Sequence, residues 1–391
     1  MPAAILATIV ALAAALGFAA APAAAATAVG GFAARLAAIA ALPDAARAAA
    51  ADSLWRDLPG GATPVVEDST AHFLFWGDAA TVAVAGDMTF WRADLPLERL
   101  AGTSLWHAAF TCPPDSRLDY KLVVDGDRWL QDPMNPRTVT GGFGPNSELA
   151  MPAYVDPPEQ AERDLPPCAL DGFPDFASPE LGDTRQVWVL LPPGYDPETP
   201  HPLLVVHDGR ETIGLGKLPR VMSHLAAARP ELRLPVCVCV AHVDRGEEYN
   251  GAKQEAYGRF IVETLLPFVS SRYAVSMDPA DRGSMGASAG GHVSVYLAGR
   301  YPEQFTRLIL MSPYIPDAKR ALYALRAPAE SRVYINWGRW DLPAIPPLAE
   351  AFTAALAERG IDHEARVYNE GHSWGLWRAT IDDGLLAAFG D

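Results

Sequence analysis

Ser288 has the sequence setting of a nucleophile. It is the central residue of the pentapeptide GASAG (residues 286–290), and the composition of residues 291–300 predicts a helix directly after it. A G-x-S-x-G pattern between a strand and a helix makes a sharp turn, in which small neighbours avoid collisions and the serine is strained. The hydroxyl then projects at the helix N-terminus, where developing negative charge is stabilised. The pattern therefore predicts nucleophilic attack by Ser288.

An aspartate and a histidine follow Ser288 in the chain order that is typical of α/β-hydrolases. Asp341 comes just after a predicted strand at 331–338, and His372 comes just after the last predicted strand, at 363–370. A serine hydroxyl needs a base that takes its proton, and the base needs an acid that fixes its tautomer. We therefore predict a catalytic triad of Ser288, His372 and Asp341. The alternative is that Asp341 only caps the next helix and that His372 is an ordinary surface loop residue.

Strands and helices are predicted to alternate through residues 169–391. Further strands are predicted at 184–191, 202–207, 235–242 and 305–312, and a long helix at 253–272. These strands are almost continuously apolar, as in a parallel sheet that helices cover on both faces. Sites in such sheets lie at the carboxyl ends of the strands. We therefore predict an α/β-hydrolase catalytic domain over residues 169–391.

The chain ahead of this domain has a different pattern. Residues 27–70 are rich in alanine and predict a helical segment. Residues 71–152 carry short alternating strands, and Asp125-Gly126 between two of them is a strong hairpin signal. Residues 153–168 contain two Pro-Pro pairs and many charges, which is typical of a linker. The sequence thus predicts a smaller, all-β sandwich before the catalytic domain.

The first 26 residues resemble a secretory signal peptide. The run from Ile5 to Ala20 is almost wholly apolar and is followed by small residues, although no Lys or Arg precedes it. The run is too short and too rich in alanine for a membrane span, so no integral membrane span is predicted. We expect a periplasmic or secreted protein. If the run is instead an alanine-rich tail, a cytoplasmic protein is expected.

Composition excludes several function classes. The chain has 391 residues and a formal net charge of −16, which argues against nucleic acid as a partner. No Cys/His cluster has zinc spacing and no phosphate-binding loop is present, so we predict no metal and no cofactor. Cys237 and Cys239 alternate within one apolar strand and are predicted to be core residues. The sequence does not decide whether Cys112 and Cys168 form a disulfide.

Several motifs resemble the enterochelin esterase-like branch of the α/β-hydrolases, which is similar to feruloyl and acetyl-xylan esterases and to S-formylglutathione hydrolases. The resemblance covers nearly all of residues 169–391. Its motifs are LLPPGY at 190–195, VHDG at 206–209, RGEEY at 245–249, the serine pentapeptide, and EGHSW at 370–374. Upstream, the segments VAGD at 84–87, GTSLW at 102–106 and YKLVVDG at 120–126 resemble an early-set immunoglobulin-like domain.

The resemblance implies further site residues. The backbone N–H of Ala289 is expected to donate to the oxyanion, with a second donor from Gly209 or Arg210. Arg245 is expected to serve the oxyanion or to hold an acidic substrate group. The alternative for Arg245 is a loop salt bridge with Glu247 or Glu248.

Tryptophans near the predicted triad are candidates for an aromatic substrate pocket. They are Trp337, Trp340, Trp374 and Trp377, with Trp340 and Trp374 as the predicted substrate-binding pair, and the alternative is plain core packing. In the predicted β-sandwich, Trp91, Trp106 and Trp129 resemble the sugar-stacking tryptophans of glycogen-binding relatives. Core packing is the favoured interpretation of these three, because aromatic residues dominate such cores.

These residues and motifs predict a serine carboxylic-ester hydrolase that works through an acyl-enzyme. The first expected substrate is a catecholate siderophore or a similar aromatic ester. An alternative is a feruloyl or acetyl-xylan type esterase acting on polysaccharide-linked esters of plant cell walls. A third hypothesis is a non-catalytic carbohydrate-binding protein, against which the intact Ser, His and Asp argue.

Overall fold

A computed structural model describes residues 31–390. The predicted signal peptide at 1–26 lies outside the described residues. Residue contacts divide the chain into two units. The first comprises Met1–Thr138 and Asn146–Tyr154, and the second comprises Val139–Pro145 and Val155–Asp391. Across residues 31–390, helices are too short or too polar to cross a membrane.

Among its described residues, the first unit contains two α-helices and two sheets. The helices are α2 (Phe32–Ala40) and α3 (Asp44–Arg56). One sheet has the order β1 (Val65–Glu67), β2 (Thr70–Trp76), β6 (Leu105–Thr111) and β5 (Glu98–Arg99). The other has the order β4 (Leu95–Pro96), β3 (Val82–Gly86), β7 (Arg117–Val124), β10 (Gly144–Ala150) and β9 (Thr138–Gly141), with β8 (Arg128–Leu130) paired to β7. Most of β9 and the first two residues of β10 belong to Val139–Pro145, which the residue contacts assign to the second unit. Both helices bury apolar side chains, including Phe32 and Leu54, against β2 and β6.

The tryptophans of this unit differ in environment. Trp106 on β6 is buried, as expected of a core residue. Trp91 is partly buried and donates from Nε1 to Asp87 Oδ1. Trp129 is 46% exposed, so its predicted core position is wrong. The reason is that the short strand β8 lies off the main path of the sheet and all three of its residues are exposed.

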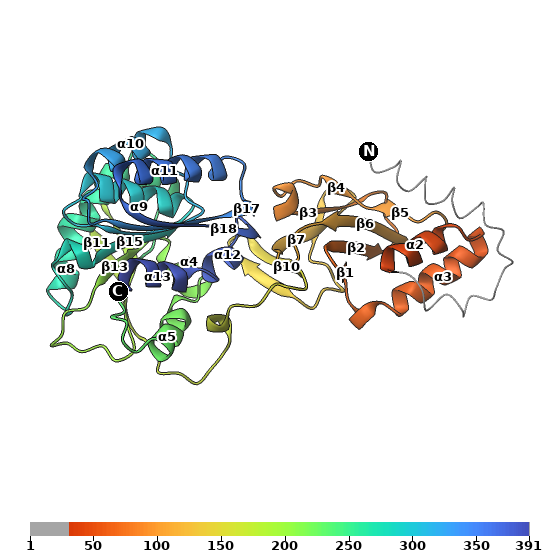
Figure 1. Cartoon of the computed structure of the whole chain (residues 1–391), viewed down its shortest axis with the longest axis horizontal. Coiled ribbons are helices and arrows are strands. Elements are labelled where there is room, and N and C mark those ends of the chain that lie inside the picture. The colour runs from red at the N-terminus through yellow and green to blue at the C-terminus, as the bar shows by residue number, and fades with distance from the viewer. Residues whose placement is uncertain (1–30, 391) are drawn as a thin grey trace. The chain divides into compact units, whose positions relative to one another are not determined.

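The second unit is built on an eight-stranded sheet (Figure 1). Its order is β11 (Ala169–Ser178), β12 (Asp183–Leu191), β14 (Val236–Val240), β13 (Leu203–Val206), β15 (Arg282–Ala287), β16 (Arg307–Met311), β17 (Arg332–Trp340) and β18 (Asp362–Gly371). Neighbouring strands are parallel from β14 to β18, whereas β12 is antiparallel to both of its neighbours. The mixed α/β class expected from the sequence is therefore confirmed.

The sequence did not predict strand β11. Its sequence contains Gly172 and Pro174, which weaken a strand signal, and its pairing with β12 is irregular between Phe173 and Phe176. Proline is tolerated there because β11 is the edge of the sheet.

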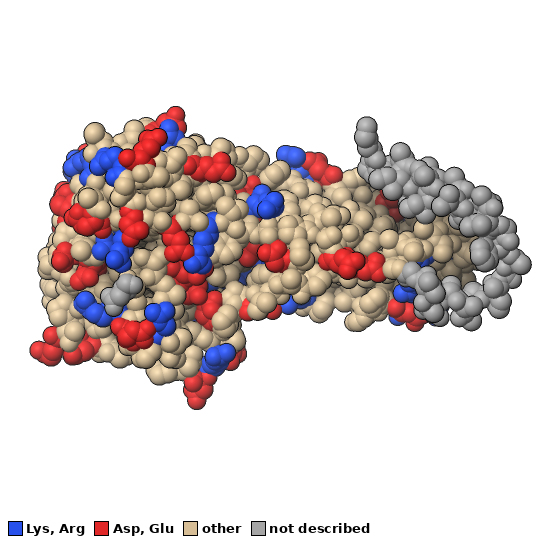
Figure 2. Space-filling view, viewed as in Figure 1, with Lys and Arg blue, Asp and Glu red and all other residues tan. Residues whose placement is uncertain are grey.

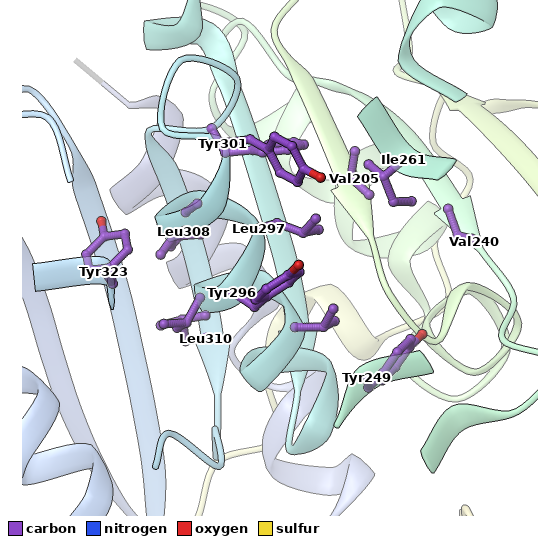
Figure 3. Close-up of a cluster of buried hydrophobic side chains, with 14 of the residues drawn as sticks. Val205, Val240, Tyr249, Ile261, Tyr296, Leu297, Tyr301, Leu308, Leu310 and Tyr323 are labelled. Carbon is purple, nitrogen blue, oxygen red and sulfur yellow. The ribbon is translucent and has the colours of Figure 1, made fainter. Parts of the chain in front are cut away.

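Helices cover both faces of this sheet (Figure 1). They are α4 (Gly209–Gly214), α5 (Leu218–Ala228), α6 (Arg245–Tyr249), α7 (Gln254–Arg259), the π-helical stretch η5 (Phe260–Leu265), α8 (Leu266–Ser270), α9 (Ala289–Arg300), α10 (Asp317–Arg326), α11 (Ile345–Arg359), α12 (Trp374–Arg378) and α13 (Ile381–Phe389). One apolar cluster includes Val205 together with Tyr296 and Leu297 of α9 (Figure 3). The other includes Leu204 and residues of α5 and α13. Alternate residues of β13 thus face opposite layers, which explains its continuous apolar run.

The cysteines are all free. Cys237 and Cys239 are buried in the second apolar cluster, which confirms the core prediction. Cys112 and Cys168 are not bridged.

Charged side chains of both signs are interspersed on the face shown in Figure 2. A nucleic-acid surface would instead gather Lys and Arg into one extended patch. This distribution agrees with the acidic composition, and nucleic acid is not indicated as a partner.

An acidic cluster at the start of α13 predicts that the free energy of unfolding depends on pH. Burial, followed by the charges of Glu159 and Asp383, raises the pKa of Asp382 to about 7. An unfolded aspartate titrates near pH ~3.9. The folded chain therefore binds this proton more tightly, and the free energy of unfolding falls as pH rises between about 4 and 7. We expect Asp382→Asn to raise the free energy of unfolding by ~1–3 kcal/mol at pH 8, a figure reduced for partial solvation.

Chemical denaturation of the two proteins at pH 5 and pH 8 measures this effect. The gain should shrink at pH 5, because Asp382 is then largely protonated in the native chain. Asp383→Asn is the matched control. Asp383 accepts a hydrogen bond from Tyr368 and pairs with Arg366, so this substitution should lower the free energy of unfolding. An equal gain at both pH values would contradict the assignment.

Candidate active site

Ser288 stands at a strained turn between β15 and α9. Its backbone has φ 55° and ψ −118°, a conformation that non-glycine residues rarely adopt. The small neighbours are needed there, because a Cβ at Gly286 would lie 2.4 Å from the carbonyl carbon of Gly290. The turn is held by hydrogen bonds from the Ser288 N–H to the Met311 carbonyl and from the Tyr314 N–H to the Ser288 carbonyl. The hydroxyl is thereby presented at the start of a helix.

The register of β17 and β18 brings an acid and a histidine together. Trp340 pairs with Gly371 across these parallel strands, so Asp341 and His372, the next residues after each, also lie side by side. Asp341 Oδ1 lies 2.6 Å from His372 Nδ1. The buried carboxylate also accepts from the N–H groups of Leu342 and Gly338. These bonds fix both oxygens and leave one of them aimed at the imidazole.

The same imidazole reaches the serine. His372 Nε2 lies 3.0 Å from Ser288 Oγ, and the imidazole side chain is 15% exposed. Trp377 of α12 packs its indole edge against the ring, with centroids 5.0 Å apart, and donates from Nε1 to Ser312 Oγ at 3.0 Å. Asp341, His372 and Ser288 thus form one hydrogen-bonded chain. A general base within reach of a nucleophile and oriented by an acid can carry out acyl transfer.

Two helix N-termini meet beside Ser288. Ala289 is the first residue of α9, and Gly209 is the first residue of α4. N–H groups in the first turn of a helix have no intrahelical acceptor and attract negative charge. The loop before α4 lies against α9, because a Cβ at Gly290 would be 3.2 Å from Asp208 Oδ2. The residue before α4 thus lies against the first turn of α9, and Ala289, Gly209 and Arg210 stay candidate oxyanion donors.

Arg245 has a different partner from those considered in the sequence. Its Nε and Nη2 donate to the two carboxylate oxygens of Asp208, each at 2.7 Å. The alternative of a salt bridge with Glu247 or Glu248 is wrong for the described structure. Glu248 is instead buried against Arg185, at 2.8 Å. The sequence suggested near neighbours, whereas the fold brings α6 against the loop that follows β13.

The side chain of Arg245 is 37% exposed despite this ion pair. The fork to Asp208 uses Nε and Nη2, so the remaining amino group, Nη1, can still reach another acceptor. Burial would lower the pKa of Arg245, but the hydrogen bonds to Asp208 outweigh it and raise the pKa. The guanidinium is therefore a fixed positive charge near the candidate site.

The tryptophans near His372 fall into two groups. Trp337 lies in the core, as the alternative interpretation held. Trp374 is buried and packs edge-on to Trp377, with centroids 5.0 Å apart. Trp340 is only partly buried at the end of β17. Of the predicted substrate-binding pair, Trp340 is thus the more accessible to a ligand.

Three residues of the cluster that binds Arg245 were not singled out from the sequence. They are Asp208, His242 and Tyr249. His242 Nδ1 lies 3.1 Å from Asp208 Oδ1, and the Asp208 N–H donates to the Tyr249 hydroxyl at 3.0 Å. The signal in the sequence that could have indicated this cluster was Asp208, an acidic residue of the VHDG motif directly after a predicted buried strand.

The electrostatics of this cluster favour an ionised Asp208. Burial would raise the pKa of Asp208, but hydrogen bonds from Arg245 and His242 outweigh it and lower the pKa to about 2. The hydrogen bond to Asp208 raises the pKa of His242. Burial lowers the pKa of the adjacent His207 to about 4, so this core histidine is neutral.

Within residues 31–390, Asp208, Glu211 and His242 have ligand atoms within 4.8 Å of one another. A cation there would have to displace the guanidinium of Arg245, which already occupies both oxygens of Asp208. These residues therefore do not favour a metal.

Comparisons with known proteins show the family of this chain. Residues 178–388 match the family model described as "Putative esterase". This chain belongs to that esterase family, and it is a carboxylic ester hydrolase. It is similar to the iron(III) enterobactin esterase of Dickeya dadantii, with 25% identity over 349 residues that cover 74% of this chain and 78% of the relative. It is also similar to the uncharacterized protein YjcH of Bacillus subtilis, with 27% identity over 227 residues, 54% of this chain and 93% of YjcH.

A solved structure extends the likeness to most of the chain. The enterochelin esterase of Shigella flexneri superposes with a TM-score of 0.66 at 21% identity, covering 83% of this chain and 93% of the other. At that identity the superposition shows a shared fold alone. Together with the family match, it confirms the resemblance to enterochelin esterases that the motifs indicated.

Proposed function

We propose that this esterase uses Ser288 as nucleophile, His372 as general base and Asp341 as the orienting acid. The observation that carries the proposal is the continuous chain of contacts, 2.6 Å from Asp341 to His372 and 3.0 Å from His372 to Ser288. In the first half-reaction, Ser288 Oγ attacks the ester carbonyl carbon while His372 Nε2 takes the hydroxyl proton. Asp341 stabilises the imidazolium that results.

The tetrahedral intermediate places its negative charge on the former carbonyl oxygen. We propose that the N–H of Ala289, together with that of Gly209 or Arg210, donates to this oxygen. Collapse breaks the bond to the leaving alcohol, which receives the proton from His372, and an acyl-enzyme is left. Water, deprotonated by His372, then attacks the acyl carbon and releases the acid and Ser288. These steps need no cofactor.

We propose a catecholate siderophore or a similar aromatic ester as substrate. Two relatives are named for enterobactin or enterochelin esterase. A partly exposed Arg245 can present Nη1 to a phenolate or carboxylate, and the partly exposed Trp340 can pack against an aromatic ring. Trp374, whose ring packs against Trp377 beside His372, is the second residue proposed to line the substrate pocket. A panel of ferric enterobactin, methyl ferulate and p-nitrophenyl acetate tests the choice, and a higher kcat/KM for methyl ferulate would favour a feruloyl esterase.

Arg245→Gln tests the substrate-binding role of the guanidinium. Losing one charge-assisted contact should raise the KM of an anionic aryl ester by ~10-fold relative to that of neutral p-nitrophenyl acetate. Steady-state kinetics with both esters give this ratio, and any change in kcat common to both is a separate effect. Arg229→Gln is a suitable control, since it removes an exposed guanidinium just after α5 that pairs with Glu231. An unchanged ratio of KM values would rule out anion binding by Arg245.

We also propose the finer architecture that the sequence predicted. Residues 169–391 are assigned to an α/β-hydrolase fold, supported by the parallel strands and by a strand–turn–helix around Ser288. Residues 71–152 are assigned to an early-set immunoglobulin-like sandwich, supported by two antiparallel sheets. The helical segment at 27–70 and the linker at 153–168 complete the division. A periplasmic or secreted location rests on the sequence of residues 1–26.

A further inference from the structure

Asp208 adopts a left-handed conformation immediately before α4. Its φ is 52° and its ψ is 47°, a region that costs a residue with a Cβ roughly 1–2 kcal/mol. This bend ends β13 and turns the chain so that α4 starts at Gly209. Because the bend is unfavourable by itself, its neighbours must hold it in place.

Three side chains hold the bend through Asp208. The Tyr249 hydroxyl accepts the Asp208 N–H, His242 contacts Oδ1, and Arg245 binds both carboxylate oxygens. The carboxylate is almost fully buried, with 6% exposed. An ionised aspartate at this depth needs such partners. Both its backbone and its side chain are therefore fixed.

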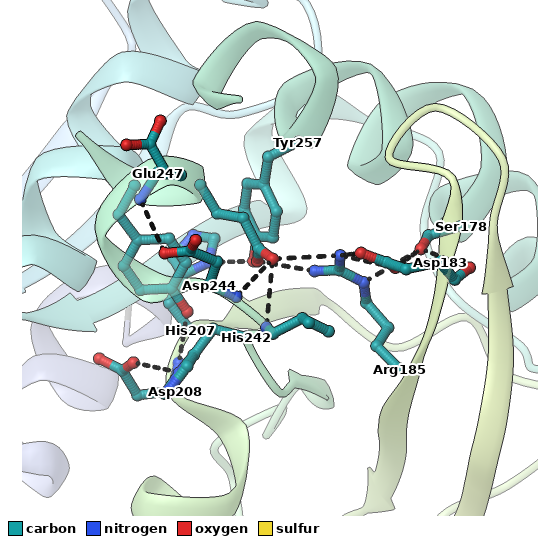
Figure 4. A network of polar contacts seen from close by, with 12 residues as sticks. Ser178, Asp183, Arg185, His207, Asp208, His242, Asp244, Glu247 and Tyr257 are labelled. Atoms are coloured by element: carbon teal, nitrogen blue, oxygen red, sulfur yellow. Dashed lines mark hydrogen bonds and ion pairs between the residues drawn. The ribbon is translucent and has the colours of Figure 1, made fainter. Parts of the chain in front are cut away.

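The loop that carries His242 and Arg245 is itself anchored from the core. The Glu248 carboxylate accepts the N–H groups of Val243 and Asp244, at 3.1 and 3.0 Å. Glu248 is held by Arg185, whose side chain is completely buried and also pairs with Asp183 (Figure 4). Figure 4 follows this network from Arg185 to His242 and on to Asp208. The network thus ends at the residue before α4.

The same cluster touches the nucleophile's turn. Arg245 Nη2 lies 3.4 Å from the carbonyl oxygen of Ala287, the residue before Ser288. On the other side, Asp208 Oδ2 faces the Cα of Gly290. The ion pair between Arg245 and Asp208 therefore joins the start of α4 to both flanks of Ser288.

We propose that Asp208 is a positioning residue that holds the N–H groups at the start of α4 in register with Ser288, and that Arg245 acts on catalysis through it. The proposal rests on the proposed function, since it assumes that Gly209 or Arg210 donates to the oxyanion. Asp208 itself touches no reacting atom. The role differs from anion binding by Arg245, because it concerns every ester, neutral ones included.

The test uses the full chain and neutral p-nitrophenyl acetate. In Asp208→Asn, an NH₂ group replaces one of the two oxygens that accept from the Arg245 guanidinium. The start of α4 then loses one of the contacts that fix its position. We expect kcat to fall by ~100-fold, the scale of a lost oxyanion donor or of a shift by ~1 Å, while KM changes by less than ~3-fold. The rate at which a fluorophosphonate phosphonylates Ser288 should fall in parallel, because that reaction also builds charge on an oxygen.

Arg245→Gln should reproduce the kcat defect on this neutral ester. The double variant Asp208→Asn/Arg245→Gln should be little worse than the more impaired single variant, because both changes break one interaction. Glu211→Gln is the matched control: it removes one negative charge from α4 outside the fork to Arg245 and should keep kcat within ~3-fold of the parent value. Thermal melts establish that each variant is folded. If Asp208→Asn does not fold, the kcat of Arg245→Gln on the neutral ester tests the proposal alone.

Two results would overturn the proposal. One is a kcat within ~3-fold of the parent in folded Asp208→Asn or Arg245→Gln, which would leave the pair with a structural role only. The other is multiplication of the two kcat defects in the double variant, which would mean independent roles. Failure of the proposed function looks different, since the unaltered protein would then not react with the fluorophosphonate at Ser288.

Discussion

Ser288→Ala is expected to lower kcat for ester hydrolysis by ~10⁶-fold without unfolding the protein. The change removes the only atom in the site that is proposed to bond to the acyl group, and triad residues act as a unit. His372→Ala should cost about as much, and the double variant should be little worse than either single variant. Steady-state kinetics on p-nitrophenyl acetate, with thermal melts for folding, measure the effect.

Ser271→Ala is the matched control for this substitution. Ser271 follows α8 and bonds through Oγ to the Phe268 carbonyl, so its loss should leave kcat unchanged. If folded Ser288→Ala kept more than about a tenth of the parent kcat, the assignment of the nucleophile would be wrong, since loss of a true nucleophile costs orders of magnitude.

Asp341→Asn is expected to lower kcat by ~10⁴-fold. Asp341 accepts from His372 Nδ1 through Oδ1 and from the Gly338 N–H through Oδ2. An asparagine must turn its NH₂ group toward one of these two, and both are donors in the productive tautomer. If the NH₂ group faces His372, the imidazole is held in the wrong tautomer and cannot take the proton of Ser288; if it faces Gly338, the imidazolium still loses the negative charge that stabilises it. Kinetics between pH 6 and 9 should show the loss throughout.

Asp317→Asn serves as the comparison, because Asp317 is an exposed residue in the first turn of α10 that pairs with Arg320. Its kcat should match that of the parent. A kcat for Asp341→Asn within ~10-fold of the parent would show that the acid is dispensable or that another carboxylate replaces it.

The sequence was a good guide wherever a local pattern determines the structure. Ser288, Asp341 and His372 each follow a strand whose apolar run is legible in the chain, and parallel strands bring their carboxyl ends to one edge. Whether these ends are neighbours depends on strand order, which long-range packing sets. The register of Trp340 with Gly371 could not be known from the strands' own sequences.

Long-range partners were the main source of error. For Arg245 the sequence indicated the oxyanion or an acidic substrate group, and the alternative partners, Glu247 and Glu248, are close along the chain. The structure instead pairs Arg245 with Asp208, 37 positions away. Propensity also failed at the sheet edges. Strand β11 contains Gly172, which weakens a strand, and Pro174, which is tolerated at the edge of a sheet. Trp129 is exposed on β8, which lies off the main path of its sheet. Each of these depends on what lies beside the residue in the fold.

The most direct measurement is the site of covalent modification by a fluorophosphonate. The reagent forms a bond from phosphorus to the attacking oxygen and releases fluoride, with the proton passing to the general base. After digestion and mass spectrometry, we expect one phosphonylated residue, Ser288, formed at a rate that falls sharply in His372→Ala. Phosphonylation at another serine, or none in protein that hydrolyses esters, would contradict the assignment of Ser288 as the nucleophile.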